Sequence, residues 1–131
     1  MSVRRKFSTF IFVFVVAVGS IAVSAQWREL GSKEVSDRLD HDTIAVTVMR
    51  GDFRRIRLNV SRAPVRFYRM TVTYGTGQTQ NIALRALIRA GGQTRAINLS
   101  GNERVIRKVD FWYEAASLGC KRARVTLYGR D

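Results

Sequence analysis

Arginine side chains at alternating positions are the residues of this chain whose chemistry is easiest to name. Arg55 and Arg57 fall on one face of an expected strand, and Arg122 and Arg124 fall on one face of another, with Tyr128 beyond them. A guanidinium group binds phosphate or carboxylate through two parallel hydrogen bonds. If the two strands lie in one sheet, these side chains form a basic surface with an aromatic ring beside it. The pattern predicts a binding site for an anionic ligand.

Trp112 is a further binding candidate, because it falls on the charged face of an expected strand with Lys108, Asp110 and Glu114. An exposed Trp can stack on a base or a sugar ring. The alternative is that Trp112 packs under a neighbouring loop or beneath arginine stems. Like charges that face one another cost stability, so we expect the arginines to pair with Glu114, Asp110 or Glu103.

The chain lacks the residues that most catalytic and metal sites require. His41 is the only histidine and Cys120 the only cysteine, whereas metal sites built from these residues need several ligands. The acidic residues of 40–42, with Asp37, could hold a cation, but acids in a turn before a strand more often cap it. We therefore expect no enzyme, no metal and no cofactor. A hydrolase with paired carboxylates is an alternative for which the sequence places no two acids together.

The basic charge of the chain indicates which partners it attracts. The formal net charge is +13; residues 1–25 hold three of the 23 basic residues and none of the ten acidic ones, which leaves +10 on residues 26–131. Such a charge attracts nucleic acid, lipid head groups or acidic cell-wall polymers. The alternative is that the charge reflects only a general preference for Arg and has no ligand. In support of it, 17 of the 20 remaining basic residues are Arg, and they are spread along the whole chain.

Residues 1–25 have the layout of a secretory signal peptide. Arg4, Arg5 and Lys6 precede an apolar run from Phe10 to Val18, and small residues lead to the Ala25–Gln26 bond. A basic start, a short apolar middle and small residues before the cut are typical of cleaved export signals. A retained membrane anchor is the alternative, but the run is shorter than the roughly 20 residues that span a bilayer. We expect a periplasmic or secreted protein without a retained transmembrane segment, cleaved between Ala25 and Gln26.

Short alternating strands account for the rest of the chain. In the clearest of them Ile56, Leu58 and Val60 point one way, and Arg55, Arg57 and Asn59 point the other. Such alternation is typical of a strand with one buried face. Pro64 ends this strand. In residues 65–74 the apolar positions change parity, which predicts a bulge near Phe67–Arg69 and places Tyr68 on the face of Met70.

The remaining expected strands span residues 27–30, 34–38, 43–48, 65–74, 79–89, 94–99, 104–114 and 122–128. Residues 83–90 form a helical turn in an alternative interpretation. Seven to nine short strands with frequent turn signals predict an all-β fold, an antiparallel β-sandwich that is jelly-roll-like or a partly open barrel. We expect a signal-peptide helix in residues 1–25 and a single β-sandwich domain in residues 26–131.

Several structural spacings resemble a family of small exported bacterial proteins of unknown function. They are Trp27-x-x-Leu30-Gly31-Ser32, Asp40-x-Asp42-Thr43-Ile44, Phe53-x-x-Ile56-x-Leu58, Ala90-Gly91-Gly92 and Arg104-x-Ile106-x-x-Val109-x-Phe111. The resemblance covers nearly all of residues 26–131. It implies one β-rich domain and a bacterial envelope setting, and it supplies no activity, cofactor or catalytic residue.

These observations together predict an exported, non-enzymatic β-sandwich that binds an anionic envelope component or a partner protein. The anionic component would be an envelope polymer or a lipid head group, with nucleic acid as a less favoured partner. The alternative is a structural or stress-related envelope protein whose arginines are only solvated.

Overall fold

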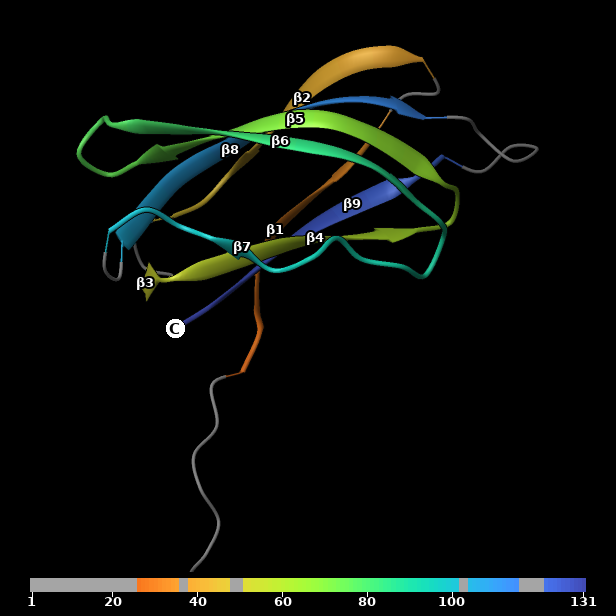
Figure 1. Ribbon diagram of the computed structural model, residues 1–131. Coiled ribbons are helices and arrows are strands. Elements are labelled where there is room, and N and C mark those ends of the chain that lie inside the picture. The colour runs from red at the N-terminus through yellow and green to blue at the C-terminus, as the bar shows by residue number, and fades with distance from the viewer. Residues whose placement is uncertain (1–25, 36–37, 48–50, 102–103, 116–121) are drawn as a thin grey trace, which may run out of the picture.

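Two antiparallel β-sheets packed face to face make up the computed structural model (Figure 1). It describes residues 26–35, 38–47, 51–101, 104–115 and 122–131. Within these residues every regular element is a strand, so the all-β antiparallel prediction is confirmed. The expected signal peptide with its helix, and Cys120, lie outside the described residues.

The nine strands formed by the described residues are divided between the two sheets. The four-stranded sheet has, in spatial order, β1 (Arg28–Glu34), β9 (Arg124–Arg130), β4 (Arg55–Ser61) and β7 (Ile97–Asn98). The five-stranded sheet has, in spatial order, β2 (Leu39–Ala45), β8 (Arg104–Ala115), β5 (Val65–Tyr74) and β6 (Thr79–Ile88), and β3 (Asp52–Phe53) also pairs with β8. No helix long and apolar enough to cross a membrane occurs in the described part of the chain.

The core lies between the sheets and consists of side chains from alternate positions. On β4, Ile56, Leu58 and Val60 are buried as expected. On β9, Val125 and Leu127 are completely buried, and the register places them opposite Val60 and Leu58. Burial of apolar surface stabilises the fold by roughly 25 cal/mol per Å², and it fixes which side of each strand faces solvent.

A β-bulge in β5 confirms the change of parity seen in the sequence. The register of β5 against both β6 and β8 shifts between Phe67 and Arg69. Phe67 and Met70, on either side of the shift, are both fully buried. Tyr68 is the extra residue, and it is 38% exposed. The prediction that Tyr68 faces inward with Met70 is therefore wrong, because the bulge turns its side chain to solvent.

β6 is a strand as far as Ile88, so the helical alternative for residues 83–90 is wrong. Arg85 has a φ of +45°, which is uncommon for a residue with a Cβ. Ala83 pairs with Arg69 and Ala86 pairs with Phe67, so β6 is also irregular where β5 bulges. The extra residues on both strands bend the sheet at this point.

Strand boundaries near the N-terminal side differ from those expected. β1 continues to Glu34 through Gly31, where the sequence predicts a turn, and its register to β9 shifts between Glu29 and Gly31. A Cβ on Gly31 would lie 2.7 Å from Cγ2 of Ile44. Glycine is therefore needed for the close approach of β2, not for a turn. The separate strand expected at 34–38 is not observed: Glu34 is the last residue of β1, Val35 and Arg38 are outside any strand, and β2 begins at Leu39.

We predict that Gly31→Ala lowers the free energy of unfolding by about 1–3 kcal/mol, as overpacking of a filled core does. Ile44 is buried and β-branched, so its methyl group has little freedom to move away. Urea unfolding followed by circular dichroism measures the change. Lys33→Ala, at an exposed position of the same strand, is the matched control and should change stability by less than about 0.5 kcal/mol. Equal stability of Gly31→Ala and the natural chain would contradict the packing argument.

Candidate functional site

The outer face of the four-stranded sheet gathers most of the predicted binding residues, because β4 and β9 are neighbours. Their register places Arg57 opposite Tyr128, Arg55 opposite Arg130, and Ser61 opposite Arg124. We call this surface the arginine face. It consists of Trp27, Arg55, Arg57, Arg124, Tyr128 and Arg130.

Aromatic rings hold two guanidinium groups of the arginine face in place. The Cζ atom of Arg57 lies 4.3 Å from the ring centroid of Trp27 and 5.7 Å from that of Tyr128. The Cζ atom of Arg130 lies 5.5 Å from the centroid of Trp27. A guanidinium group over a ring gains cation–π attraction and keeps the N–H groups at its edge free to donate. These contacts preorganise Arg57 and Arg130.

The positive charge of the arginine face is little neutralised by the chain itself. Among the described residues, Arg55, Arg57, Arg124 and Arg130 form no ion pair. Arg55 donates instead to Oδ1 of Asn98 at 3.1 Å, and Arg124 donates to the Ser32 hydroxyl at 2.8 Å.

Partial burial strengthens the electrostatic attraction between an anion and the guanidinium groups of the arginine face. The Nε atoms of Arg57 and Arg130 are buried and have no hydrogen-bond partner in the described part of the chain. The guanidinium groups are therefore already partly desolvated, and an incoming anion meets them with less competition from water.

A polar hollow of about 330 Å³ adjoins the arginine face at the end of β9. It is lined by Arg54, Arg55, Asn98, Leu99, Gly101, Arg130 and Asp131. Arg55 and Arg130 thus belong to both surfaces, and Arg54 adds a third cation. We call it the end hollow. Three arginines around one concavity match the geometry that binds a single phosphate or carboxylate group.

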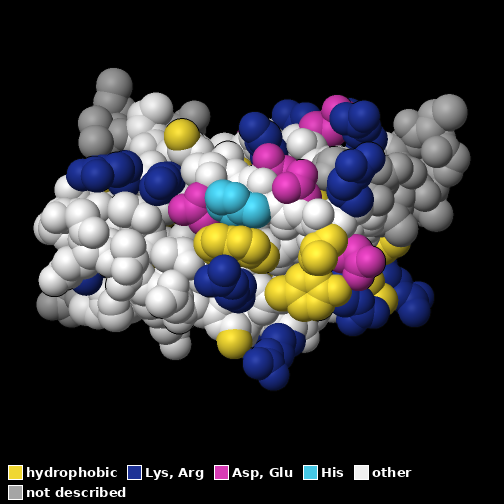
Figure 2. All heavy atoms as spheres, turned by 90° about the horizontal axis from the view of Figure 1, so that it is seen from above, with side chains coloured by type: hydrophobic (Ala, Val, Ile, Leu, Met, Phe, Trp, Pro, Cys, Tyr) yellow, Lys and Arg dark blue, Asp and Glu magenta, His cyan; other side chains and the backbone are white. Residues whose placement is uncertain are grey.

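Trp112 lies on the opposite side of the sandwich, on the outer face of β8, and not beside the arginine face. Its ring stacks on His41 with centroids 4.5 Å apart, and the Cζ atom of Arg69 lies 3.8 Å from its ring centroid. Figure 2 looks onto this face and shows the histidine between acidic and hydrophobic side chains. The alternative in which an arginine covers Trp112 is the one that the structure shows.

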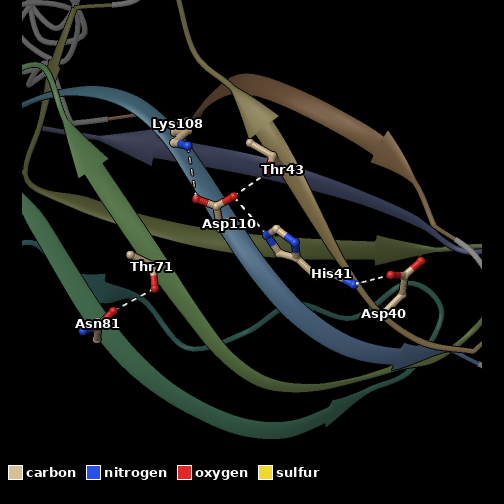
Figure 3. A network of polar contacts seen from close by, with 7 residues as sticks. All are labelled: Asp40, His41, Thr43, Thr71, Asn81, Lys108 and Asp110. Carbon is tan, nitrogen blue, oxygen red and sulfur yellow. Dashed lines mark hydrogen bonds and ion pairs between the residues drawn. The ribbon is translucent and has the colours of Figure 1, made fainter. Parts of the chain in front are cut away.

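His41 belongs to a polar network centred on Asp110 (Figure 3). Its Nε2 atom lies 3.1 Å from Oδ1 of Asp110, which also accepts a hydrogen bond from the Thr43 hydroxyl. Lys108 Nζ lies 3.8 Å from the other carboxylate oxygen. Burial raises the pKa of Asp110, but the hydrogen bonds from Thr43 and His41 and the charge of Lys108 outweigh burial and lower it. The network fastens β2 to β8.

This network does not assemble the chemistry of a hydrolase or a metal site. Thr43 contacts the carboxylate and not the imidazole, whereas a nucleophilic triad needs the imidazole between the hydroxyl and the acid. Asp42 pairs with Phe111 in the ladder and accepts a hydrogen bond from the Tyr113 hydroxyl at 2.7 Å. Strand alternation thus separates Asp42 from His41. No group of three possible metal ligands occurs among the described residues.

Several expected partnerships differ from those observed. Asp110 and Glu114 lie on the opposite sheet from the arginine face, and Glu114 accepts a hydrogen bond from the Tyr68 hydroxyl at 2.9 Å. The expectation that they pair with its arginines is wrong, because β8 belongs to the other sheet. Arg122 is exposed and precedes β9, outside its ladder. Ala25 and Glu103 lie outside the described residues, and Gln26 is exposed.

Two residues of the arginine face were not singled out from the sequence. Arg130 continues the two-residue spacing of Arg124 and Tyr128 beyond the expected end of the strand, so the alternation itself was an available signal. Trp27 had no such signal. It comes into contact with Arg57 only because β1 pairs with β9 in the structure.

Comparison with known proteins assigns a family and leaves the activity open. A family model described as a domain of unknown function, DUF2541, matches residues 9–129. No curated protein matches the chain. The crystal structure of the SPBc2 prophage-derived protein YomS is similar, with a TM-score of 0.44 and 12% sequence identity. The match covers 85% of this chain and 98% of that chain.

The lowered pKa of Asp110 predicts a pH dependence of stability. Its folded pKa lies below the ordinary value of 3.8, so its stabilising contribution is complete above that value and is lost as the pH falls through the folded pKa. Asp110→Asn should therefore be less stable than the natural chain at neutral pH, and the difference should shrink in acid. Urea unfolding from neutral pH to below the folded pKa measures this.

Thr43→Val tests the cause of the lowered pKa of Asp110, because it removes the hydrogen bond from the Thr43 hydroxyl and keeps the Asp110 carboxyl group. The acid loss of stability should then be smaller and should be complete at a higher pH, because the folded pKa of Asp110 lies closer to its unfolded value. A difference between Asp110→Asn and the natural chain that is the same at every pH would contradict the assignment.

Proposed function

We propose, since this chain belongs to the DUF2541 family of domains of unknown function, that it is an exported, non-enzymatic module that binds an anionic polymer of the cell envelope. The binding surface is the arginine face, with the end hollow at one end. The observation that carries the proposal is the register between β4 and β9, which gathers four arginines on one surface.

The spacing of the cations favours a polymer over a single small anion. Residues two apart on a strand are separated by about 6.6–6.8 Å, and neighbouring strands by about 4.8 Å. Arg55 is two residues from Arg57 on β4 and opposite Arg130 on β9, so it is one such step from each of these cations, and Arg124 adds a fourth cation at the other end of β9. A row of cations of this kind suits the repeated charges of a linear phosphate or carboxylate polymer better than one small anion. Each phosphate contact releases counterions, so binding of this kind depends strongly on salt.

The aromatic residues of the face suit the uncharged part of such a polymer. Trp27 is half-buried and Tyr128 is half-buried, so each keeps part of its ring at the surface. A sugar ring can stack on such a surface while the neighbouring phosphate or carboxylate contacts arginine.

Export favours an envelope polymer over nucleic acid as the ligand, because an exported protein encounters envelope polymers and not nucleic acid. It is supported by the basic start, the apolar run and the small residues before Gln26. His41 and Asp110 lie on the opposite sheet from the arginine face.

We predict that Arg55→Gln combined with Arg57→Gln weakens retention on immobilised linear polyphosphate and reduces the salt slope of binding by about 2, one for each lost phosphate contact. Elution from the resin at increasing NaCl concentration measures both quantities. The matched control is Arg38→Gln combined with Arg107→Gln, which removes the same charge from exposed positions of the five-stranded sheet side. The control should keep the slope of the natural chain.

An equal loss in both double variants would show that net charge alone is responsible and would contradict the arginine face. Retention on an acidic protein resin, with none on polyphosphate at the same salt, would favour an acidic partner protein instead. Circular dichroism of each variant establishes that the fold is intact.

We also predict that the protein recovered from the envelope fraction of its host begins at Gln26. Removal of residues 1–25 takes three basic and no acidic residues, so the mature chain has a formal charge of +10. N-terminal sequencing and intact mass measure the cleavage. The Ala25→Leu variant is the control, because a large residue before the bond should block the peptidase. A full-length chain in the cytoplasm would contradict export.

A further inference from the structure

A second concave surface lies on the opposite side of the sandwich, at the bulge that joins β5 and β6. It has a volume of about 540 Å³ and is lined by Arg66, Phe67, Tyr68, Arg69, Ala83 and Arg85. We call it the bulge hollow. We propose that it binds a small phosphate ester that carries a planar ring, such as an aryl phosphate. This site is independent of the arginine face, which belongs to the other sheet.

The bulge itself creates the hollow. Relative to β8, the register shift between Phe67 and Arg69 adds a residue on β5; relative to β5, β6 has an additional residue at the same place, where Arg85 adopts a positive φ. A positive φ costs conformational energy in a residue with a Cβ, so the surrounding structure must hold the residue in that conformation. Such residues are concentrated at binding sites. Opposite Arg69 the strand carries only the methyl group of Ala83, which leaves room for a ligand beside the guanidinium group.

Three cations line the bulge hollow, and the described part of the chain supplies no ion pair to any of them. They are Arg66, Arg69 and Arg85. The Cζ atom of Arg69 lies over the Trp112 ring, 3.8 Å from its centroid, so the position of the guanidinium group is set before a ligand arrives. Guanidinium groups around one concavity can donate several charge-assisted hydrogen bonds to a phosphate group.

The ring-binding part of the hollow is Tyr68. Its hydroxyl donates to Glu114 at 2.9 Å, which orients the ring. This hydrogen bond raises the pKa of Tyr68 further above its ordinary value. Ala83 completes the apolar surface. The volume is within the range of roughly 300–1,000 Å³ that ligand pockets occupy, which is ample for one ring with one phosphate group.

The charges that face the hollow favour an anion. Arg66, Arg69 and Arg85 contribute three positive groups, and Glu114 contributes one carboxylate through its contact with Tyr68. Glu114 is opposite Arg66 in the β5–β8 ladder, so a ligand that presents its phosphate to Arg69 and Arg85 and its ring to Tyr68 keeps the phosphate farther from this carboxylate. The arrangement therefore selects a phosphate and a ring joined in one molecule.

Trp112 supplies a direct measurement of binding. The chain has two Trp residues, so in a Trp27→Phe background the tryptophan emission comes from Trp112 alone. Because Arg69 stacks on Trp112, a ligand that contacts Arg69 changes the emission. We expect phenyl phosphate to produce a saturable change, inorganic phosphate a weaker one, and phenol none. Calorimetry on the natural chain repeats the titration without the Trp27 substitution.

Two variants separate the anion from the ring. Arg85→Gln should weaken phenyl phosphate binding about tenfold or more, as loss of a charge-assisted hydrogen bond does. Arg107→Gln, at an exposed position of β8 that does not line the hollow, should leave it unchanged. Ala83→Leu should remove the advantage of phenyl phosphate over inorganic phosphate, because its side chain takes the place of the ring. Circular dichroism checks that each variant folds.

No saturable change with phenyl phosphate at millimolar concentration, in fluorescence and in calorimetry, would overturn the site. Equal affinity for phenyl phosphate and inorganic phosphate would overturn the ring-binding part. Equal weakening by Arg85→Gln and Arg107→Gln would also overturn the site, since it would mean that only net charge attracts the ligand.

Discussion

The register between β4 and β9 is the constraint on which the rest of the structure depends. Seven residue pairs join these central strands, and a slip by one residue would turn every side chain to the opposite face. The completely buried Val125 and Leu127 resist such a slip because it would expose them. The same alternation sends Tyr128 and Arg130 outward. The packing of the core therefore determines which side chains form the arginine face.

A chain with so many arginines must place like charges close together, and the structure offsets their repulsion in the same way on both faces. On the four-stranded sheet Arg57 lies over Trp27, and on the five-stranded sheet Arg69 lies over Trp112. An aromatic ring attracts a guanidinium group without neutralising its charge. Each arginine is therefore held in position and still able to bind an anion. An ion pair, such as that of Arg62 with Glu34, would hold the arginine equally well but would occupy its hydrogen-bond donors.

The polar groups that resemble catalytic residues have a mechanical role in this fold. Asp110 accepts from Thr43 and His41 across the β2–β8 ladder and lies near Lys108 on its own strand. β2 is at the edge of its sheet and pairs with β8 alone. Side-chain contacts of this kind supplement the ladder where no second neighbour exists. The single histidine is thus explained by its stacking and its hydrogen bond, and the two sheets have different surfaces: one with exposed cations and one with an acidic network beside a cationic hollow.

The sequence by itself determined the local features. Its period of two located the buried faces of β4, β8 and β9, and the change of parity located the bulge of β5, because alternation depends only on neighbours along the chain. It also showed the spacing of Arg55 and Arg57. Only the tertiary structure decided that β9 pairs with β4, that Trp27 covers Arg57, and that Trp112 lies on the far sheet. Strand order and register depend on which distant segments pack against one another, and no local pattern of residues specifies those long-range contacts.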